Sequence, residues 1–156
     1  IRIGVLADST LHARRLGVSR LRLLASPAYQ ARHGTPDRIE LLSAHRLLGF
    51  TAPASLNIWP LPQPGGDGFP VLPVIAASSG ETLRHLALGG AGIVCLADFL
   101  TRGDVASGRL VPILESITLR WTQPVWAVFY KQEALTPRVD ALLGFLAQRL
   151  GDILDK

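Results

Sequence analysis

The sequence is poor in the residues from which small domains build disulfides and metal sites, and it has no long apolar run. It has one cysteine, four histidines and no methionine in 156 residues. Since Cys95 has no partner for an intrachain disulfide, a cytoplasmic setting is favoured. No apolar run approaches the ~20 residues that a membrane-spanning helix needs, so we expect no membrane partner. Residues 1–4 show no charged-then-apolar leader, and we expect the chain to begin inside a strand of a longer protein.

The few histidines and the cysteine are poorly placed for metal binding. No two histidines stand at the helical spacing that brings ligands together; they are His12, His33, His45 and His85. Each is more typical of a surface or half-buried position. Cys95 lies within an apolar run, which indicates a small buried side chain rather than a nucleophile. We expect neither a metal nor a cofactor.

Motifs of catalysis are missing as well. Ser78 and Ser79 lack the glycine two residues earlier that a nucleophile elbow requires. The glycines of 89–92 follow an expected helix and enter a strand, the reverse of a dinucleotide-binding loop. No set of catalytic residues can be assembled, so the sequence predicts that the chain is not an enzyme.

Positive charge is not concentrated anywhere along the chain. Lys and Arg total 16 against 12 Asp and Glu, and Arg14–Arg15 is the one adjacent basic pair. A surface that binds nucleic acid needs basic residues clustered on one element. We therefore expect this chain not to contact DNA itself.

Apolar and turn residues alternate along the chain in a way that predicts strands and helices in succession, as in an α/β sheet with helices on its faces. Strands are expected at residues 1–4, 21–25, 46–51, 56–61, 71–77, 93–96, 109–114 and 125–130. Helices are expected after Ser26–Pro27 through His33, after Thr35–Pro36, after Ser78–Ser79, at 98–106 and after Thr136–Pro137.

Local signals place the ends of the first two helices. Gly34 is predicted as the C-cap of the first. Thr35 and Pro36 are predicted as the N-cap and first residue of the second. That second helix would turn three apolar side chains inward, Ile39, Leu41 and Leu42.

The segment between the strands expected at 56–61 and 71–77 is rich in glycine and proline. Such a segment between two strand-like runs predicts a hairpin with a long, mobile tip. A domain linker is the alternative, and the strand character of the flanking runs favours the hairpin.

Two later helices have distinctive patterns. Ser78 and Glu81 stand at the spacing of a capping box, in which the serine caps the amide of Glu81 and Glu81 reaches back. This helix would bury Leu83, Leu86 and Ala87. The last helix carries a single apolar stripe, Val139, Leu142, Leu143, Leu146, Leu150 and Ile153.

Binding features are stronger than catalytic ones. The helix start at 78–81 offers backbone amides that favour an anion or carboxylate, although an ordinary capped helix explains it too. Expected strands also end at Gly4, Ser26 and Thr51, and strand ends are where open α/β sheets bind ligands. From the residues alone, the chain is an α/β ligand-binding module.

The order of short motifs resembles the effector-binding domain of LysR-type transcriptional regulators over the whole chain. Ile1–Gly4 looks like the family's strand D-x-A-I-R-I-G. Residues 11–34 resemble the run ARRLG…LVASPAYLARHG of one large subgroup. Thr35–Pro36 to His45 looks like TP…DLAxH, and residues 81–111 follow GEALRxxALAGxGIxxLPDFLVxxxLxxGRLVPVL. Each run is short, and it is their order and spacing that carry the resemblance.

The resemblance implies a fold like that of type 2 periplasmic binding proteins, with two α/β subdomains and a ligand cleft. Residues 28–121 would form subdomain II, and residues 1–27 with 122–156 the remaining part of an incomplete subdomain I. The strands at 21–25 and 125–130 would run near the hinges. The helix-turn-helix would lie in an N-terminal domain absent from this chain, through which a homodimer or tetramer would contact DNA.

By position in the family, the cleft would be lined by Gly4, Val5, Ser26, Phe50, Thr51, Ser78 and Ser79. Thr51 and Ser78 are the expected hydrogen-bond donors and Phe50 an apolar wall. A purely structural role is the alternative at each position.

The resulting hypothesis is a small-molecule sensor, with a small carboxylate or aromatic acid as the favoured effector class. A solute-binding protein of a transport system shares the fold and is the alternative. A small α/β enzyme is the third reading, disfavoured by the absence of a catalytic set.

Overall fold

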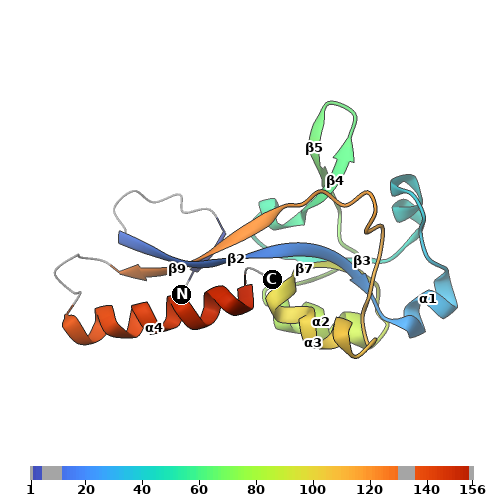
Figure 1. Ribbon diagram of the computed structural model, residues 1–156. Helices are drawn as coiled ribbons and strands as arrows, with labels where there is room; N and C mark the ends of the chain where they lie inside the picture. The colour runs from blue at the N-terminus through green and yellow to red at the C-terminus, as the bar shows by residue number, and fades with distance from the viewer. Residues whose placement is uncertain (1, 5–11, 130–135, 155–156) are drawn as a thin grey trace. The chain divides into compact units, whose positions relative to one another are not determined.

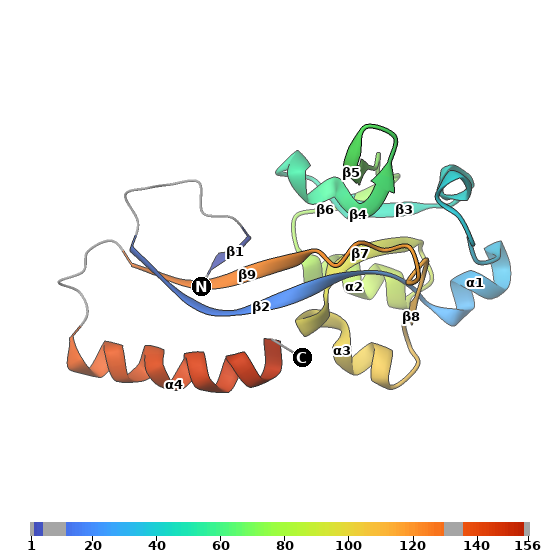
Figure 2. The same cartoon turned by 45° about the horizontal axis from the view of Figure 1, so that its top comes forward.

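The computed structural model describes residues 2–4, 12–129 and 136–154. They form two compact units, one from residues 1–20 with 122–156 and the other from residues 21–121. Strand β2 (His12–Ala25) begins in the first unit and ends in the second. Figures 1 and 2 show the course of the chain. The two units are described separately.

The unit of residues 21–121 is built on a mixed sheet in which the order of strands is β2, β7, β3, β6. β2 runs antiparallel to β7, and β3 runs parallel to both β7 and β6. A short strand, β8, pairs with the end of β2. The bounds are β3 (Leu47–Phe50), β6 (Ile75–Ala77), β7 (Ile93–Ala97) and β8 (Val111–Pro112).

The central strand β7 is buried throughout and serves both faces of the sheet. Ile93 and Cys95 pack in one apolar cluster, and Val94 and Leu96 pack in the other, because successive side chains of a strand point to opposite faces. Burial of one such aliphatic side chain contributes about 1.5–3 kcal/mol. The sequence therefore reads as a continuous apolar run, as expected of a strand covered on both sides.

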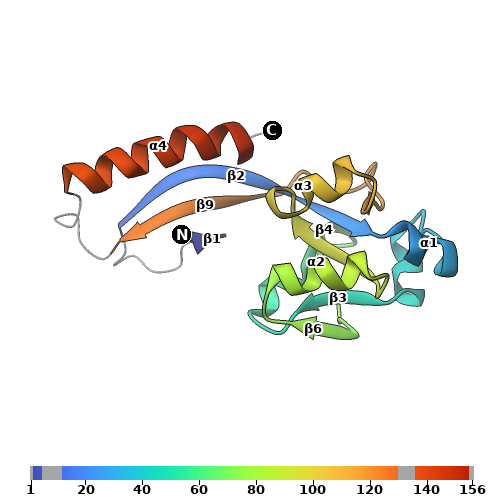
Figure 3. The ribbon, with the colours of Figure 1, turned by 90° about the horizontal axis from the view of Figure 1, so that it is seen from below.

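Two helices cover one face of this sheet. α2 (Gly80–Leu88) and α3 (Asp98–Ala106) contribute Leu83, Ala87 and Leu100 to its cluster, and Figure 3 shows α2 beside β3 and β6. The other face is covered by α1 (Pro27–His33), the 3-10 helix η1 (Ile39–Ala44) and a hairpin.

Several predicted elements are confirmed. α3 has the predicted bounds, and β7 extends one residue beyond the predicted strand. α1 follows Ser26, and Gly34 is its C-cap with a φ of 78°, in the region where glycine has no steric penalty. These elements carry strong local signals, which tertiary contacts reinforce.

The prediction of a helix that starts at Thr35–Pro36 is wrong. The structure has the 3-10 helix η1, which begins after Arg38. The Thr35 hydroxyl donates to Gln30 Oε1 at 3.2 Å instead of capping a helix. Leu42 is buried as predicted, and Ile39 packs against the same cluster.

The hairpin exists, but its second strand was wrongly placed. β4 (Ile58–Gln63) pairs with β5 (Gly66–Pro70), so the glycine-rich segment is itself a strand rather than a long tip. A Cβ at Gly68 would lie 2.6 Å from Trp121 Cη2, so glycine is needed where the indole covers the hairpin. Figure 1 shows the hairpin standing out from its unit. Of the strand predicted at 71–77, only β6 forms, and it pairs with β3.

Strand lengths were also mispredicted elsewhere. β2 begins at His12, nine residues before the predicted start at Leu21, and the strand predicted at 109–114 is reduced to β8. β9 (Thr122–Phe129) begins three residues before the predicted start at Val125, and Tyr130, its predicted end, lies outside the described residues. A 3-10 helix that was not predicted, η2 (Ala54–Asn57), precedes β4.

In the other unit, β9 lies between β1 (Arg2–Ile3) and the first part of β2, all antiparallel. α4 (Pro137–Leu154) packs on these strands through Leu143, with Leu146 and Leu150 beside it (Figure 2). The predicted apolar stripe is wrong at Val139 and Leu142, which are exposed. The side chain of Ile153 lies outside the described residues.

Candidate ligand site at the start of α2

Two parallel strands end side by side in the unit of residues 21–121. Phe50, the last residue of β3, lies opposite Ala77, the last residue of β6. The Thr51 amide then donates to the Ala77 carbonyl at 3.1 Å, so the next residues of both strands share one edge. Thr51, Ser78 and Ser79 are exposed there. Carboxyl ends of parallel strands are the usual ligand edge of α/β sheets.

Asn57 fixes the backbone of this edge. Its Oδ1 accepts from the Phe50 amide and its Nδ2 donates to the Phe50 carbonyl, both at 2.8 Å. The amide side chain thus completes β3 as a neighbouring strand would. A Cβ at Gly49 would lie 2.5 Å from Asn57 Oδ1, so glycine is required for this approach. Sequence analysis missed Asn57, because a lone Asn in a loop gives no sign of the strand that it serves.

Phe50 contributes the apolar part of the edge. Its ring is half-buried and packs with the cluster beneath α2. A Cβ at Gly80, the first residue of α2, would lie 3.2 Å from Leu100 Cδ2 and 3.8 Å from Phe50 Cζ. Glycine therefore lets the start of the helix come close to this ring, and an aromatic surface adjoins the first backbone amides of α2.

The predicted capping box at the start of α2 is wrong. The N-cap is Ser79, with extended backbone and no side-chain capping hydrogen bond. The amides in the first turn of a helix have no intrahelical acceptor. The start of α2 therefore presents backbone amides beside the exposed hydroxyls of Ser78 and Ser79.

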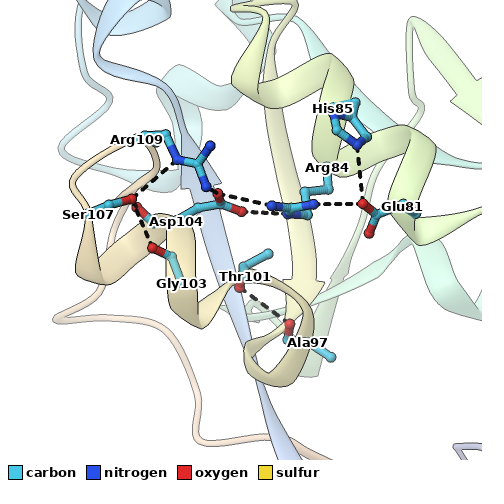
Figure 4. Close-up of polar contacts among 9 residues, drawn as sticks. All are labelled: Glu81, Arg84, His85, Ala97, Thr101, Gly103, Asp104, Ser107 and Arg109. Atoms are coloured by element: carbon cyan, nitrogen blue, oxygen red, sulfur yellow. Dashed lines mark hydrogen bonds and ion pairs between the residues drawn. The ribbon is translucent and has the colours of Figure 1, made fainter.

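Glu81 fails to cap because Arg84 and His85 hold its carboxylate (Figure 4). Its Oε1 lies 2.6 Å from Arg84 Nη1 and 3.2 Å from His85 Nε2. Arg84 also binds Asp104 of α3 through two nitrogens, Nε to Oδ2 at 2.5 Å and Nη2 to Oδ1 at 3.1 Å. The negative charge in the first turn of α2 is thus paired with the positive charge of Arg84 and lies in contact with the His85 ring.

Asp104 is the anchor of this network, with no exposed side-chain surface. Arg109 Nη2 lies 2.5 Å from its Oδ1, and Arg109 also donates to Ser107 (Figure 4). The hydrogen bond from Arg84 holds the pKa of Asp104 below its ordinary value, and the same bond raises the pKa of Arg84. A buried carboxylate with two arginines fixes α2 against α3 from the side.

The other predicted site residues lie elsewhere. Ser26 is buried at the start of α1, where its Oγ accepts from the Tyr29 amide at 3.3 Å. Leu24 and Leu48 both lie opposite Val94, and β2 runs against β3, so Ser26 lies at the opposite end of the sheet from Thr51. The structure brings together Phe50, Thr51, Ser78 and Ser79, and does not bring Ser26 to them.

Gly4 and Val5 belong to the other unit. The Gly4 carbonyl accepts from Trp126 Nε1 at 3.0 Å, and its amide donates to the Pro124 carbonyl at 2.9 Å. Gly4 has a φ of 97°, which favours glycine at this turn. Val5 lies outside the described residues.

The grouped residues suit binding by hydroxyls, amides and one aromatic ring. Within residues 2–4, 12–129 and 136–154, no three His, Cys, Asp or Glu side chains gather as a metal site. Cys95 is buried as predicted, and burial raises the pKa of its thiol. Across that same part of the chain, no helix has the length and apolar character needed to cross a membrane.

Comparison with known proteins relates the chain to one family. A model described as the LysR substrate binding domain matches residues 1–151. The chain is 47% identical over 154 residues to the HTH-type transcriptional regulator CrgA of Neisseria meningitidis serogroup B, covering 99% of this chain and 52% of that protein. An HTH-type transcriptional regulator of Xanthomonas campestris is 33% identical over 159 residues, covering 96% and 45%. The chain thus spans about half the length of these relatives.

Solved structures agree with this match. The regulatory domain of CrgA from Neisseria meningitidis superposes with a TM-score of 0.88 at 46% identity, covering 97% of this chain and 76% of that one. The effector domain of AmpR from Pseudomonas aeruginosa, at 20% identity, superposes with a TM-score of 0.74 and covers 95% and 69%. At that identity it shows the fold alone. The fold is α/β and of the type 2 periplasmic-binding-protein kind, as predicted.

Proposed function

Because this chain belongs to the LysR substrate binding domain family, we propose that it is the effector-binding domain of a cytoplasmic LysR-type transcriptional regulator. It acts as a sensor and turns over no substrate. The observation that carries this proposal is the edge where Phe50, Thr51, Ser78 and Ser79 meet, which offers hydroxyls, backbone amides and an aromatic ring. The relatives are transcriptional regulators, which favours this function over that of a solute-binding protein for transport.

The effector is a small carboxylate or aromatic acid. Thr51 and Ser78 supply hydroxyl donors, and Phe50 supplies an apolar wall. The amides at the start of α2 add partial positive charge, which favours a carboxylate over a neutral group. Pairing of Glu81 with Arg84 and His85 reduces the repulsion that its charge would exert on such a ligand.

The domain works as part of a larger assembly. Residues 28–121 belong to subdomain II, and residues 1–27 with 122–156 to subdomain I, although residues 21–27 group with residues 28–121 as one compact unit. The full-length protein is a homodimer or tetramer and contacts DNA through a helix-turn-helix domain outside this chain. The names of the curated relatives, HTH-type transcriptional regulators, support this arrangement.

Thermal denaturation of the chain against a panel of small carboxylates tests the proposal. A specific ligand at 100 times its Kd stabilises a one-site protein by about 2.7 kcal/mol, which gives a readable rise in Tm. Thr51→Ala and Ser78→Ala should each weaken the response, and Ser43→Ala, an exposed serine on η1, should not. A saturable ligand whose affinity is unchanged in both Thr51 and Ser78 variants would refute this site.

A further inference from the structure

A buried tyrosine hydroxyl joins α1 to the start of β3. Tyr29 is 1% exposed. Its phenol oxygen lies 2.9 Å from the Arg46 amide nitrogen and 3.1 Å from His45 Nδ1. The phenol therefore bridges two consecutive residues at the entrance to the strand whose far end carries Phe50 and Thr51.

Proton counting determines the direction of both hydrogen bonds. A backbone amide can only donate, so the phenol oxygen accepts from Arg46. The phenol oxygen could also accept from His45, but the buried phenol proton would then have no acceptor, so we assign this proton to His45 Nδ1, which carries the lone pair. This assigns the neutral form of His45 with its proton on Nε2. A second proton, on Nδ1, would leave the buried phenol proton without its acceptor.

The bridge holds Arg46, on which the pairing of β3 with β7 depends. The Arg46 carbonyl accepts from the amide of Ile93, the first residue of β7, at 2.8 Å. A Cβ at Gly92 would lie 2.3 Å from the Arg46 oxygen, so the chains approach as closely as a glycine allows. Holding Arg46 through Tyr29 therefore sets where β3 and β7 begin to pair.

We propose that Tyr29 and His45 form a pH-sensitive latch, which holds the start of β3 while His45 is neutral and releases it when His45 is protonated. The latch uses no residue of the proposed ligand site and does not depend on an effector. It adds a response to acid at the start of β3, the end opposite the proposed ligand site.

Of the charged groups near His45, His33 favours its neutral form. His33, also on α1, stacks on the Tyr29 ring with centroids 4.6 Å apart. Asp37 and Glu40, on the adjoining segment, are exposed, and among the described residues no carboxylate forms an ion pair with His45. The Arg46 side chain is exposed. Burial, and then the charge of His33, lower the pKa of His45 from 6.5.

Protonation of His45 destabilises the folded chain. Because the folded pKa of His45 lies below the unfolded value, the unfolded chain binds more protons between the two. The latch therefore contributes its full stabilisation above about pH 6.5, and the contribution is lost as the pH falls through the folded pKa.

NMR of the full chain tests the latch through the His45 ring and the Arg46 amide. His45 should titrate below 6.5. Tyr29→Phe, which keeps the ring and removes the donor, should raise the pKa of His45, since a bond to the neutral form is lost. Protection of the Arg46 amide against hydrogen exchange should fall roughly fivefold or more as His45 becomes protonated, the size expected when a buried donor loses its acceptor.

His45→Gln is the matched control, because it keeps a neutral acceptor that does not titrate. In this variant, protection of the Arg46 amide should not change over the same pH range. Equal loss of protection in parent and His45→Gln would overturn the latch, and so would an unchanged pKa of His45 in Tyr29→Phe.

Discussion

The starts of α1 and α2 use the same residue type in opposite ways. Ser26 and Ser79 are both N-cap residues with extended backbone. The Ser26 hydroxyl is buried and accepts from the Tyr29 amide. Ser79 is exposed, and its side chain makes no capping hydrogen bond.

The difference lies in what holds each helix in place. α1 is a short helix whose first turn is capped by the Ser26 hydroxyl. α2 is held from the side, where Arg84 joins the buried Asp104 of α3 and draws Glu81 away from the N-cap. A helix that is anchored along its length can leave the hydroxyls and amides of its first turn for a ligand.

Removing the anchor of α2 should have the largest effect. Asp104→Asn leaves Arg84, whose side chain is 19% exposed, without its buried partner. Breaking a buried ion pair costs about 3–5 kcal/mol, and the partial exposure of the arginines places the expected loss near the lower end. Urea denaturation measures it. Asp140→Asn is the control, because its pair with Arg14 is exposed and should contribute less than about 1 kcal/mol.

Acid should erase the difference between the parent and Asp104→Asn. Arg84 holds the pKa of Asp104 below its ordinary value of 3.8. A carboxyl with a lowered folded pKa stabilises the fold above its unfolded pKa, and this contribution is lost as the pH falls through the folded pKa. Stability curves of the two proteins should therefore converge below about pH 4. A gap that stays constant into strong acid would mean that Asp104 acts by packing alone.

The two serine caps should differ in a direct exchange for alanine. Ser26→Ala removes a capping acceptor in a buried position and should cost about 1 kcal/mol. Ser79→Ala should change the free energy of unfolding by no more than about 0.5 kcal/mol. Chemical denaturation of the pair gives both values. A loss at Ser79 as large as that at Ser26 would show that the start of α2 also depends on its cap.

Giving α2 a cap of its own should have the smallest effect on stability. Ser79→Asp places a carboxylate at the helix start, where it gains about 0.3–1 kcal/mol from the helix dipole. The same carboxylate should compete with a carboxylate ligand, so the ligand-induced rise in Tm should shrink. An unchanged ligand response in a stabilised Ser79→Asp variant would place the ligand elsewhere.

Local sequence signals predicted those elements that local contacts determine. α1, β7 and α3 follow from a serine–proline start, an apolar run and a helical pattern. Thr51 follows from a strand end, and Ser78 from a helix start and from its position in the family. The capping box failed because Arg84 pairs with Asp104, 20 residues away, and draws Glu81 toward α2 itself. The i,i+3 spacing of Glu81 and Arg84 is a local pattern, whereas the contact of Arg84 with Asp104 is not.

Strand pairing was the other limit. The pattern of strand ends predicts Ser26 beside Thr51, but β2 runs antiparallel to β7, which places Ser26 at the far end of the sheet. The hairpin was mispredicted because Trp121, distant in sequence, covers Gly68 and lets a glycine-rich segment form a strand. The direction of a strand and the strand with which it pairs depend on contacts between residues that are far apart in the sequence.

Backbone amide shifts on addition of a carboxylate that raises the Tm of the chain test most directly whether the start of α2 is the ligand site. The amides of Ser79, Gly80 and Glu81 should shift with ligand concentration and saturate, while those of Tyr29 and Gln30 at the start of α1 should not move. Saturable shifts at the start of α1 with none at the start of α2 would contradict the account.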